Sequence, residues 1–166
     1  MSLNKEKINE LEGKAKEILS EVYGGNIVPP IDPMELLKKY SLTLKLGEFN
    51  DPNVMGALDR KNNEIYISKS DNFSRQAFTI AHEFSHFLLH RNVEKDVLYR
   101  TEVLMLDKQD KVEEQEANCL AAAILMPKEL IEVFWRRLGE VESMAKLFGT
   151  SFTAMSWRLK NLGLIE

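Results

Sequence analysis

All three histidines of this 166-residue chain lie close together, and the first two bracket a glutamate in the run His82-Glu83-Phe84-Ser85-His86. Residues four apart on a helix share one face, with Cβ atoms about 5–6 Å apart. Two imidazoles at that separation can bind one Zn²⁺ ion, each through an N–Zn bond of about 2.0–2.1 Å. Glu83 then lies beside the metal, where a general base for a metal-bound water is needed. The motif therefore predicts a hydrolytic zinc site with His82 and His86 as ligands and Glu83 as the catalytic residue.

A catalytic zinc ion usually has three protein ligands and keeps a fourth position for water. His90 lies one helical turn beyond His86, about 6 Å further along the same helix, so it cannot easily join the same ion. The expected third ligand is therefore a carboxylate from another helix. The acidic run at residues 113–116 begins such a helix.

Glu114 is the preferred ligand in this acidic run. Asn118 follows it by four residues and shares its helix face, where an amide could orient a metal ligand from the outer coordination sphere. Glu113 and Glu116 remain alternatives. All three glutamates could instead be present for their favourable interaction with the helix dipole.

A transition state with developing negative charge also needs a hydrogen-bond donor besides the metal. Tyr66, His90 and Tyr99 are the candidate donors.

The sequence around the motif predicts a buried helix over residues 73–90, capped by Asp71 or Ser74. A five-residue motif can arise by chance, but chance gives no reason to gather every histidine into one apolar helix. The apolar residues of this segment are Ala77, Phe78, Ile80, Ala81, Phe84, Phe87, Leu88 and Leu89.

Short alternating segments at residues 42–46, 54–58 and 64–68 predict three strands in a small antiparallel sheet, with a hairpin turn at residues 59–63. The last strand precedes the histidine helix and could offer an edge to an extended peptide. Helices are predicted over the remaining periodic segments, which are 8–22, 33–40, 112–125, 128–138, 141–148 and 152–162. Residues 91–112 are expected to form a loop with a strand or a short helix that walls the cleft.

The predicted fold class is α+β: a small antiparallel three-stranded sheet packed on a mostly helical body with a buried histidine helix. Residues 1–166 are expected to form one metallopeptidase domain, with residues 141–163 as a helix-turn-helix-like subregion.

Composition is that of an ordinary globular protein, with 44% hydrophobic and 29% charged residues. A net charge of −4 gives no general attraction to nucleic acid. A single cysteine, Cys119, excludes an internal disulfide and suits a reducing compartment. The N-terminus lacks the apolar core of a signal peptide, and no apolar run approaches the length of a membrane span. The chain is expected to be cytoplasmic, without a membrane partner.

Three segments, in order, resemble the ImmA/IrrE family of zinc metallo-endopeptidases: residues 82–86, residues 114–118 and the run Ala121-Ala122-Ala123-Ile124-Leu125-Met126-Pro127. The ending at residues 156–163 is also similar, so the resemblance extends from about Tyr66 to the C-terminus. Ser85 departs from the glycine that many members have there, and Cys119-Leu120 departs from the usual residues after the asparagine.

The resemblance implies a gluzincin-like fold with one Zn²⁺ per chain on His82, His86 and Glu114, and with Glu83 as the catalytic residue. It implies a protein substrate, typically a helix-turn-helix repressor of a phage, a mobile element or a stress regulon. Fused sensory or DNA-binding domains, which some relatives carry, are not expected in this chain.

Two other functions compete with a peptidase. Residues 141–159 have a helix-turn-helix rhythm with Gly149 at the turn, which would suit a DNA-associated regulator. A recognition helix that begins Phe152-Thr153-Ala154 offers few groups to base edges, however, so nucleic acid is an unlikely partner. The basic residues nearby are Arg136, Arg137, Lys146, Arg158 and Lys160.

A non-catalytic zinc protein that binds a repressor is the second alternative, with Cys119 as a fourth ligand. Cys119 follows Glu114 by five positions and is expected nearer the opposite helix face, as a core thiol.

Overall fold

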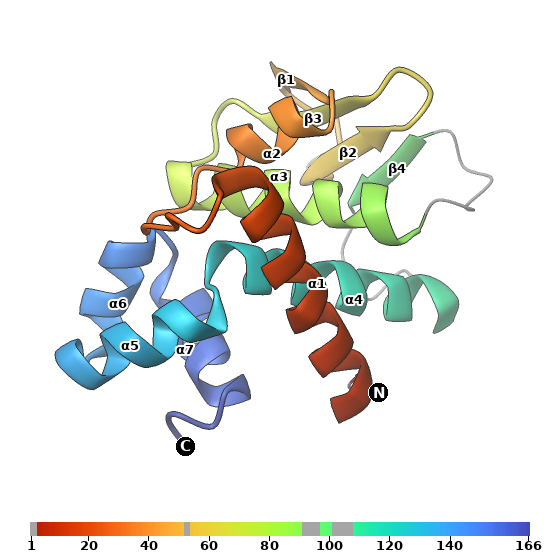
Figure 1. The fold of residues 1–166 in the computed structure, drawn as a ribbon. Coiled ribbons are helices and arrows are strands. Elements are labelled where there is room, and N and C mark those ends of the chain that lie inside the picture. The colour runs from red at the N-terminus through yellow and green to blue at the C-terminus, as the bar shows by residue number, and fades with distance from the viewer. Residues whose placement is uncertain (1–2, 52–53, 91–96, 101–107) are drawn as a thin grey trace.

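The described part of the chain forms a small mixed sheet that lies on one side of a group of helices (Figure 1). The computed structural model describes residues 3–51, 54–90, 97–100 and 108–166. The strands are β1 (Thr43–Gly47), β2 (Gly56–Asp59), β3 (Glu64–Ser68) and β4 (Val97–Arg100). The helices are α1 (Lys5–Tyr23), α2 (Met34–Lys39), α3 (Phe73–Leu89), α4 (Lys108–Leu125), α5 (Lys128–Leu138), α6 (Val141–Phe148) and α7 (Phe152–Asn161). No helix in these ranges is long and apolar enough to cross a membrane.

The sheet has the strand order β1-β3-β2-β4. β2 and β3 form the predicted antiparallel hairpin, in which Asp59 pairs with Glu64. The turn between them contains Asn63 at a φ of 55°, a left-handed conformation that asparagine tolerates better than most residues. β4 pairs antiparallel with the other edge of β2.

The predicted α+β class is confirmed, but the sheet differs from the expected three antiparallel strands. It has a fourth strand, and β1 runs parallel to β3 because β3 inserts between β1 and β2. Ile65 and Ile67 of this central strand are 0% and 2% exposed. The alternation that predicted the strands reports which face each residue occupies and carries no information about which strands are neighbours.

The histidine helix α3 packs on the sheet face that contains Ile65 and Ile67. Every residue from Thr79 to His86 is buried. The helix begins after Asn72, whose side-chain oxygen accepts a hydrogen bond from the backbone N–H of Arg75 at 3.0 Å. The cap is therefore neither Asp71 nor Ser74, the two residues that the sequence favoured.

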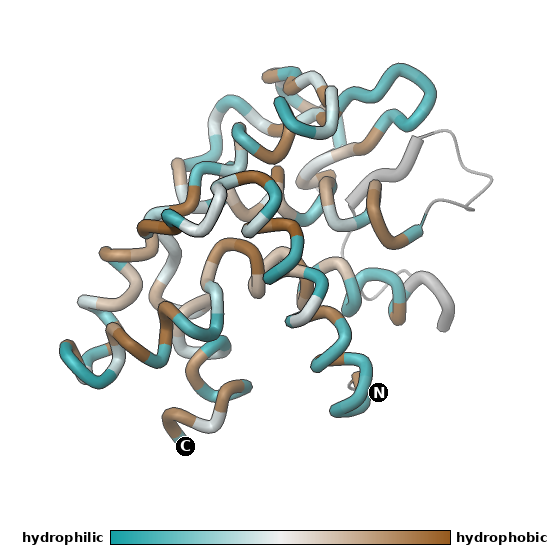
Figure 2. The backbone as a smooth tube through the Cα atoms, viewed as in Figure 1, coloured by the Kyte–Doolittle hydropathy of each residue, from teal (hydrophilic) through white to brown (hydrophobic). Residues whose placement is uncertain are grey.

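On the side away from the sheet, α3 packs against α4, and α1 in turn crosses α4 (Figure 1). The buried face of α1 consists of Leu11, Ala15, Ile18 and Leu19, which recur at helical spacing. Figure 2 shows that α4 is more polar near its beginning and more apolar near its end. The apolar end joins the core, so the polar beginning is left to carry the acidic residues beside α3.

The C-terminal helices α5, α6 and α7 follow one another around the end of α4 (Figure 1). Arg158 of α7 is only 5% exposed. Its Nε donates to the carbonyl of Met126 at 2.9 Å, and its two terminal nitrogens form an ion pair with Glu12 of α1. This contact connects the first and last helices of the chain.

Candidate metal centre

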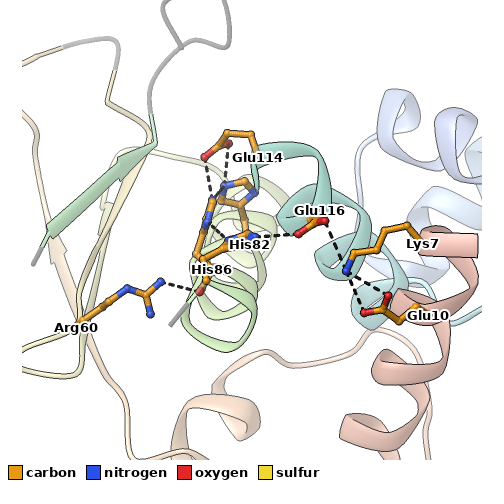
Figure 3. A network of polar contacts seen from close by, with 8 residues as sticks. Lys7, Glu10, Arg60, His82, His86, Glu114 and Glu116 are labelled. Carbon is orange, nitrogen blue, oxygen red and sulfur yellow. Dashed lines mark hydrogen bonds and ion pairs between the residues drawn. The ribbon is translucent and has the colours of Figure 1, made fainter. Parts of the chain in front are cut away.

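Three side chains from α3 and α4 converge at one point in the structure: His82, His86 and Glu114 (Figure 3). The Nε2 atoms of the two histidines are 3.1 Å apart. Glu114 places Oε2 at 3.2 Å from Nε2 of His82 and Oε1 at 2.9 Å from Nε2 of His86. Within the residues that the structure describes, this is the group whose ligand atoms all lie within 4.8 Å of one another.

These distances fit a zinc ion. Two ligand atoms that each lie about 2.0–2.1 Å from a tetrahedral ion are about 3.3 Å apart, close to the three separations between His82, His86 and Glu114. Two imidazoles and a carboxylate are also a ligand set found in catalytic zinc sites. The residues therefore suit a zinc ion that keeps one position open.

His82 is oriented by Asn118 of α4. Its Nδ1 lies 3.0 Å from Oδ1 of Asn118. An amide oxygen can only accept, so Nδ1 carries the ring proton and donates, and the lone pair of Nε2 is left facing the cluster. Asn118 therefore lies where an amide can orient the ring of His82.

His86 is oriented by His90. The Nδ1 atoms of the two rings are 2.9 Å apart, and Nε2 of His90 lies 3.1 Å from Oε2 of Glu116. His90 thus contacts the opposite side of the His86 ring from Glu114. Burial lowers the pKa of His90, and its hydrogen bond with Glu116 only partly offsets this. This position does not fit the predicted donor to a transition state, because the His86 ring separates His90 from the cluster.

The three glutamates that the sequence left open now differ in position. Glu114 lies in the cluster, Glu116 contacts His90, and the cluster does not include Glu113. Burial by itself raises the pKa of Glu114, but its hydrogen bonds and charge interactions with His82 and His86 outweigh burial and lower the pKa. Glu114 is therefore held as a carboxylate, the form that binds metal.

Glu83 is 1% exposed and lies between α3 and the first residue of β2. A Cβ atom placed on Gly56 would be 2.9 Å from Oε1 of Glu83 and 2.5 Å from Cγ2 of Thr79. The absence of a side chain at Gly56 thus lets the strand approach the predicted catalytic residue. Gly56 was not predicted from the sequence, although a glycine within a strand can indicate such a close approach.

The structure describes the side chain of Tyr66 but only the backbone of Tyr99, the two tyrosines predicted as hydrogen-bond donors. Tyr66 alternates with Ile65 and Ile67 along β3, so it lies on the sheet face away from α3, and its hydroxyl donates to Glu64. That position does not fit the predicted role near the metal. The backbone of Tyr99 pairs with Ala57 of β2, and its side chain lies outside the described part, so its role stays a prediction.

Arg60, from the hairpin turn, is a second residue whose role was not predicted from the sequence. Its guanidinium donates to the carbonyl of His86 at 2.7 Å (Figure 3). It also donates to the carbonyl of Phe87 at 3.4 Å. The carbonyl of His86 also accepts from the backbone N–H of His90, so Arg60 adds a cationic donor at the C-terminal end of α3, where positive charge is favourable. Arg60 therefore connects the hairpin to the end of α3.

Residues 42–160 match the family described as the IrrE N-terminal-like domain, peptidase M78. The chain belongs to this family. The resemblance to ImmA/IrrE proteins that the sequence suggested is therefore confirmed for most of the chain.

Two individual proteins are similar to this chain, one in sequence and one in structure. The radiation response metalloprotease IrrE of Deinococcus deserti is 38% identical over 86 residues, which cover 51% of this chain and 30% of that protein. A Mycobacterium tuberculosis transcriptional regulator has a similar structure, with a TM-score of 0.71 at 16% identity over 91% of this chain and 46% of that one. The second likeness shows a shared fold only. The chain thus spans less than half the length of either relative.

The single cysteine of this M78-family chain lies apart from the candidate metal ligands. Cys119 is not in the cluster formed by His82, His86 and Glu114. Burial raises the pKa of its thiol to about 11, and the charges that act on it belong to Glu12, Arg158 and Glu116. These surroundings are those of a core thiol at the α1–α7 side of α4.

Proposed function

We propose that this chain is a zinc-dependent endopeptidase. The observation that carries the proposal is the convergence of His82, His86 and Glu114 at separations close to those of tetrahedral zinc ligands. The position of Glu83 on the same helix supports it, and so does membership of a peptidase family. One zinc ion per chain is expected, because the cluster supplies three ligands for a single ion.

Each residue has a distinct role in the proposed mechanism. His82, His86 and Glu114 would hold the metal, and Asn118 fixes the ring of His82 through its Nδ1. A zinc ion bound there would supply Lewis acidity to a water molecule and to the scissile carbonyl. Glu83 accepts the proton from the attacking water and returns it to the leaving amine. Burial of Glu83 between α3 and β2 limits the range of positions its carboxylate can take.

A helix-turn-helix repressor of a phage, a mobile element or a stress regulon is the proposed substrate, cleaved at a specific site in the cytoplasm. The resemblance to the ImmA/IrrE family supports this choice. The DNA-associated alternative has less support, because Arg158, one of the basic residues behind it, is buried against Glu12 and Met126.

Metal content tests the first part of the proposal. Metal-free protein is reconstituted with Zn²⁺, and the bound zinc is measured by elemental analysis in wild type, Glu83→Gln, Glu114→Ala and Cys119→Ala. We expect one zinc in wild type, Glu83→Gln and Cys119→Ala, and weaker binding in Glu114→Ala. A folded wild type that binds no zinc would remove the proposal, and loss of zinc in Cys119→Ala would favour a closed structural site.

Cleavage tests the second part. Candidate repressors are incubated with zinc-loaded wild type and with zinc-loaded Glu83→Gln, and the products are identified by mass spectrometry. We expect one cleavage site with the wild type and none with the variant. If the variant retains zinc and cleaves at the wild-type rate, Glu83 is not the general base.

A further inference from the structure

The two histidines of the cluster have different partners behind them. His82 donates to an amide oxygen, whereas His86 faces a second imidazole, that of His90. A neutral imidazole has one donor and one acceptor nitrogen, so it can pass a hydrogen bond from one neighbour to the next. His86, His90 and Glu116 are arranged in such a chain.

Only one arrangement of protons satisfies this chain when His86 binds a metal through Nε2. Its Nδ1 then carries the ring proton and donates across 2.9 Å to Nδ1 of His90. Nε2 of His90 carries the other proton and donates across 3.1 Å to Oε2 of Glu116. Both contacts are made with His90 neutral, and neither nitrogen of His90 is left for a metal.

Glu116 is itself held by the N-terminal helix. Its Oε1 lies 3.6 Å from Nζ of Lys7, and Lys7 also donates to Glu10 at 3.0 Å (Figure 3). The carboxylate therefore lies between an imidazole from the end of α3 and an ammonium group from α1. Three helices thus contribute to the contacts behind His86.

We propose that His90 and Glu116 are positioning residues for His86, and that Lys7 holds Glu116 in place from α1. A metal-bound histidine commonly donates its other N–H to a carboxylate, which fixes the ring and raises its basicity. Here the imidazole of His90 lies between the carboxylate of Glu116 and the ligand His86, so it transmits the orienting effect of the carboxylate to the ring of His86. The inference rests on the proposed zinc site, and it explains the positions of His90 and Glu116 without giving either a direct part in the chemistry.

The test compares zinc affinity in a set of variants by competition with a chromophoric chelator. Loss of an outer partner of a metal ligand typically weakens binding about 10–100-fold, so His90→Leu and Glu116→Ala are expected to fall in that range. His90→Gln should stay close to wild type, because its amide can accept from His86 and donate to Glu116. Lys7→Met should weaken binding less than about fivefold, since the ammonium group is partly exposed and its contact is long.

A matched control comes from the same helix. Lys16 of α1 forms an exposed ion pair with Glu129 of α5 at 2.9 Å, away from this chain of contacts. Lys16→Met should therefore leave zinc affinity unchanged. The visible absorption spectrum of the Co²⁺-substituted protein provides a second readout, and we expect it to change in His90→Leu and Glu116→Ala and to return to the wild-type shape in His90→Gln.

The outcomes separate this inference from the proposed function. If the wild type binds no zinc, both the proposed function and this inference are wrong. If the wild type binds zinc, and His90→Leu and Glu116→Ala have the same zinc affinity and the same Co²⁺ spectrum as the wild type, only this inference is wrong. If circular dichroism shows that His90→Leu is unfolded, Glu116→Ala and His90→Gln decide the question. If His90→Gln and His90→Leu weaken zinc binding equally, the inference is also wrong, because the hydrogen bonds of residue 90 would then not determine zinc affinity.

Discussion

Replacing Gly56 with alanine tests how closely β2 approaches the proposed general base. The backbone of Gly56 is not among the left-handed positions of the described residues, so alanine can adopt it and the substitution acts through the added methyl group alone. That methyl carbon would lie 2.5 Å from Cγ2 of Thr79 and 2.9 Å from Oε1 of Glu83. Both distances are shorter than real Cβ contacts. Either α3 or β2 must therefore shift, or the side chains of Thr79 and Glu83 must move away.

The size of the effect follows from these distances. Ordinary contacts begin at 3.4 Å, so the Thr79 methyl must move by about 0.9 Å and the Glu83 carboxylate by about 0.5 Å. Overpacking of this kind costs about 1–3 kcal/mol, which lowers Tm by roughly 3–10 °C in a chain of this size. A misplacement of about 1 Å can cost about 100-fold in rate, so we expect kcat/KM to fall by about 10–100-fold.

Three measurements on zinc-loaded protein check this prediction: thermal unfolding, zinc affinity and repressor cleavage. Zinc affinity should change little, because the three atoms nearest to the added methyl group belong to Thr79 and Glu83 and not to the metal ligands. Gly13→Ala is the control, since nothing lies within 4 Å of a Cβ at this position in α1, and alanine should stabilise the helix by about 1 kcal/mol. A Gly56→Ala protein with wild-type Tm and wild-type cleavage would refute the reasoning.

Further predictions concern three other residues. Cys119, whose pKa is raised by burial to about 11, stays protonated below that pH; at pH 8 its thiolate fraction is about one in a thousand, against about one in four for a free thiol. Alkylation by iodoacetamide at pH 8 should therefore be about 100-fold slower than in unfolded protein and should accelerate as pH rises, and equal rates would contradict this. Asn118→Leu should weaken zinc binding about 10–100-fold by releasing Nδ1 of His82, whereas Asn118→Asp should retain it; chelator competition distinguishes the two. Arg158→Met should cost about 3 kcal/mol because it leaves Glu12 partly buried without a cation; urea unfolding measures the loss, and an unchanged midpoint would exclude it.

Local spacing was enough to predict much of the candidate site. His82 and His86 lie four residues apart on a helix whose flanks are apolar, so both the helix and the shared face could be read from the sequence. The relation between Glu114 and Asn118 follows the same rule on α4, and the structure brings both to α3. These features depend on neighbours along the chain, which is the information that a sequence gives directly.

What the sequence could not give depends on packing between segments. His90 follows His86 by the same four residues that separate His86 from His82, yet the ring of His86 turns one nitrogen to the cluster and the other to His90. The spacing of residues along the sequence does not show which nitrogen of the His86 ring faces His82 and which faces His90. The order of β1 and β3 and the space beside Gly56 likewise depend on which surfaces meet in three dimensions.

The ion pair between Glu12 and Arg158 has a consequence for synthesis of the chain. Its partners are 146 residues apart, so Glu12 leaves the ribosome long before its cation exists. The proposed zinc ligands, by contrast, are complete once Glu114 has been made. A nascent chain halted between Glu114 and Arg158 would carry every ligand while the carboxylate of α1 still lacked its partner. The proposed metal ligands are therefore all present in the chain before the contact between α1 and α7 can form.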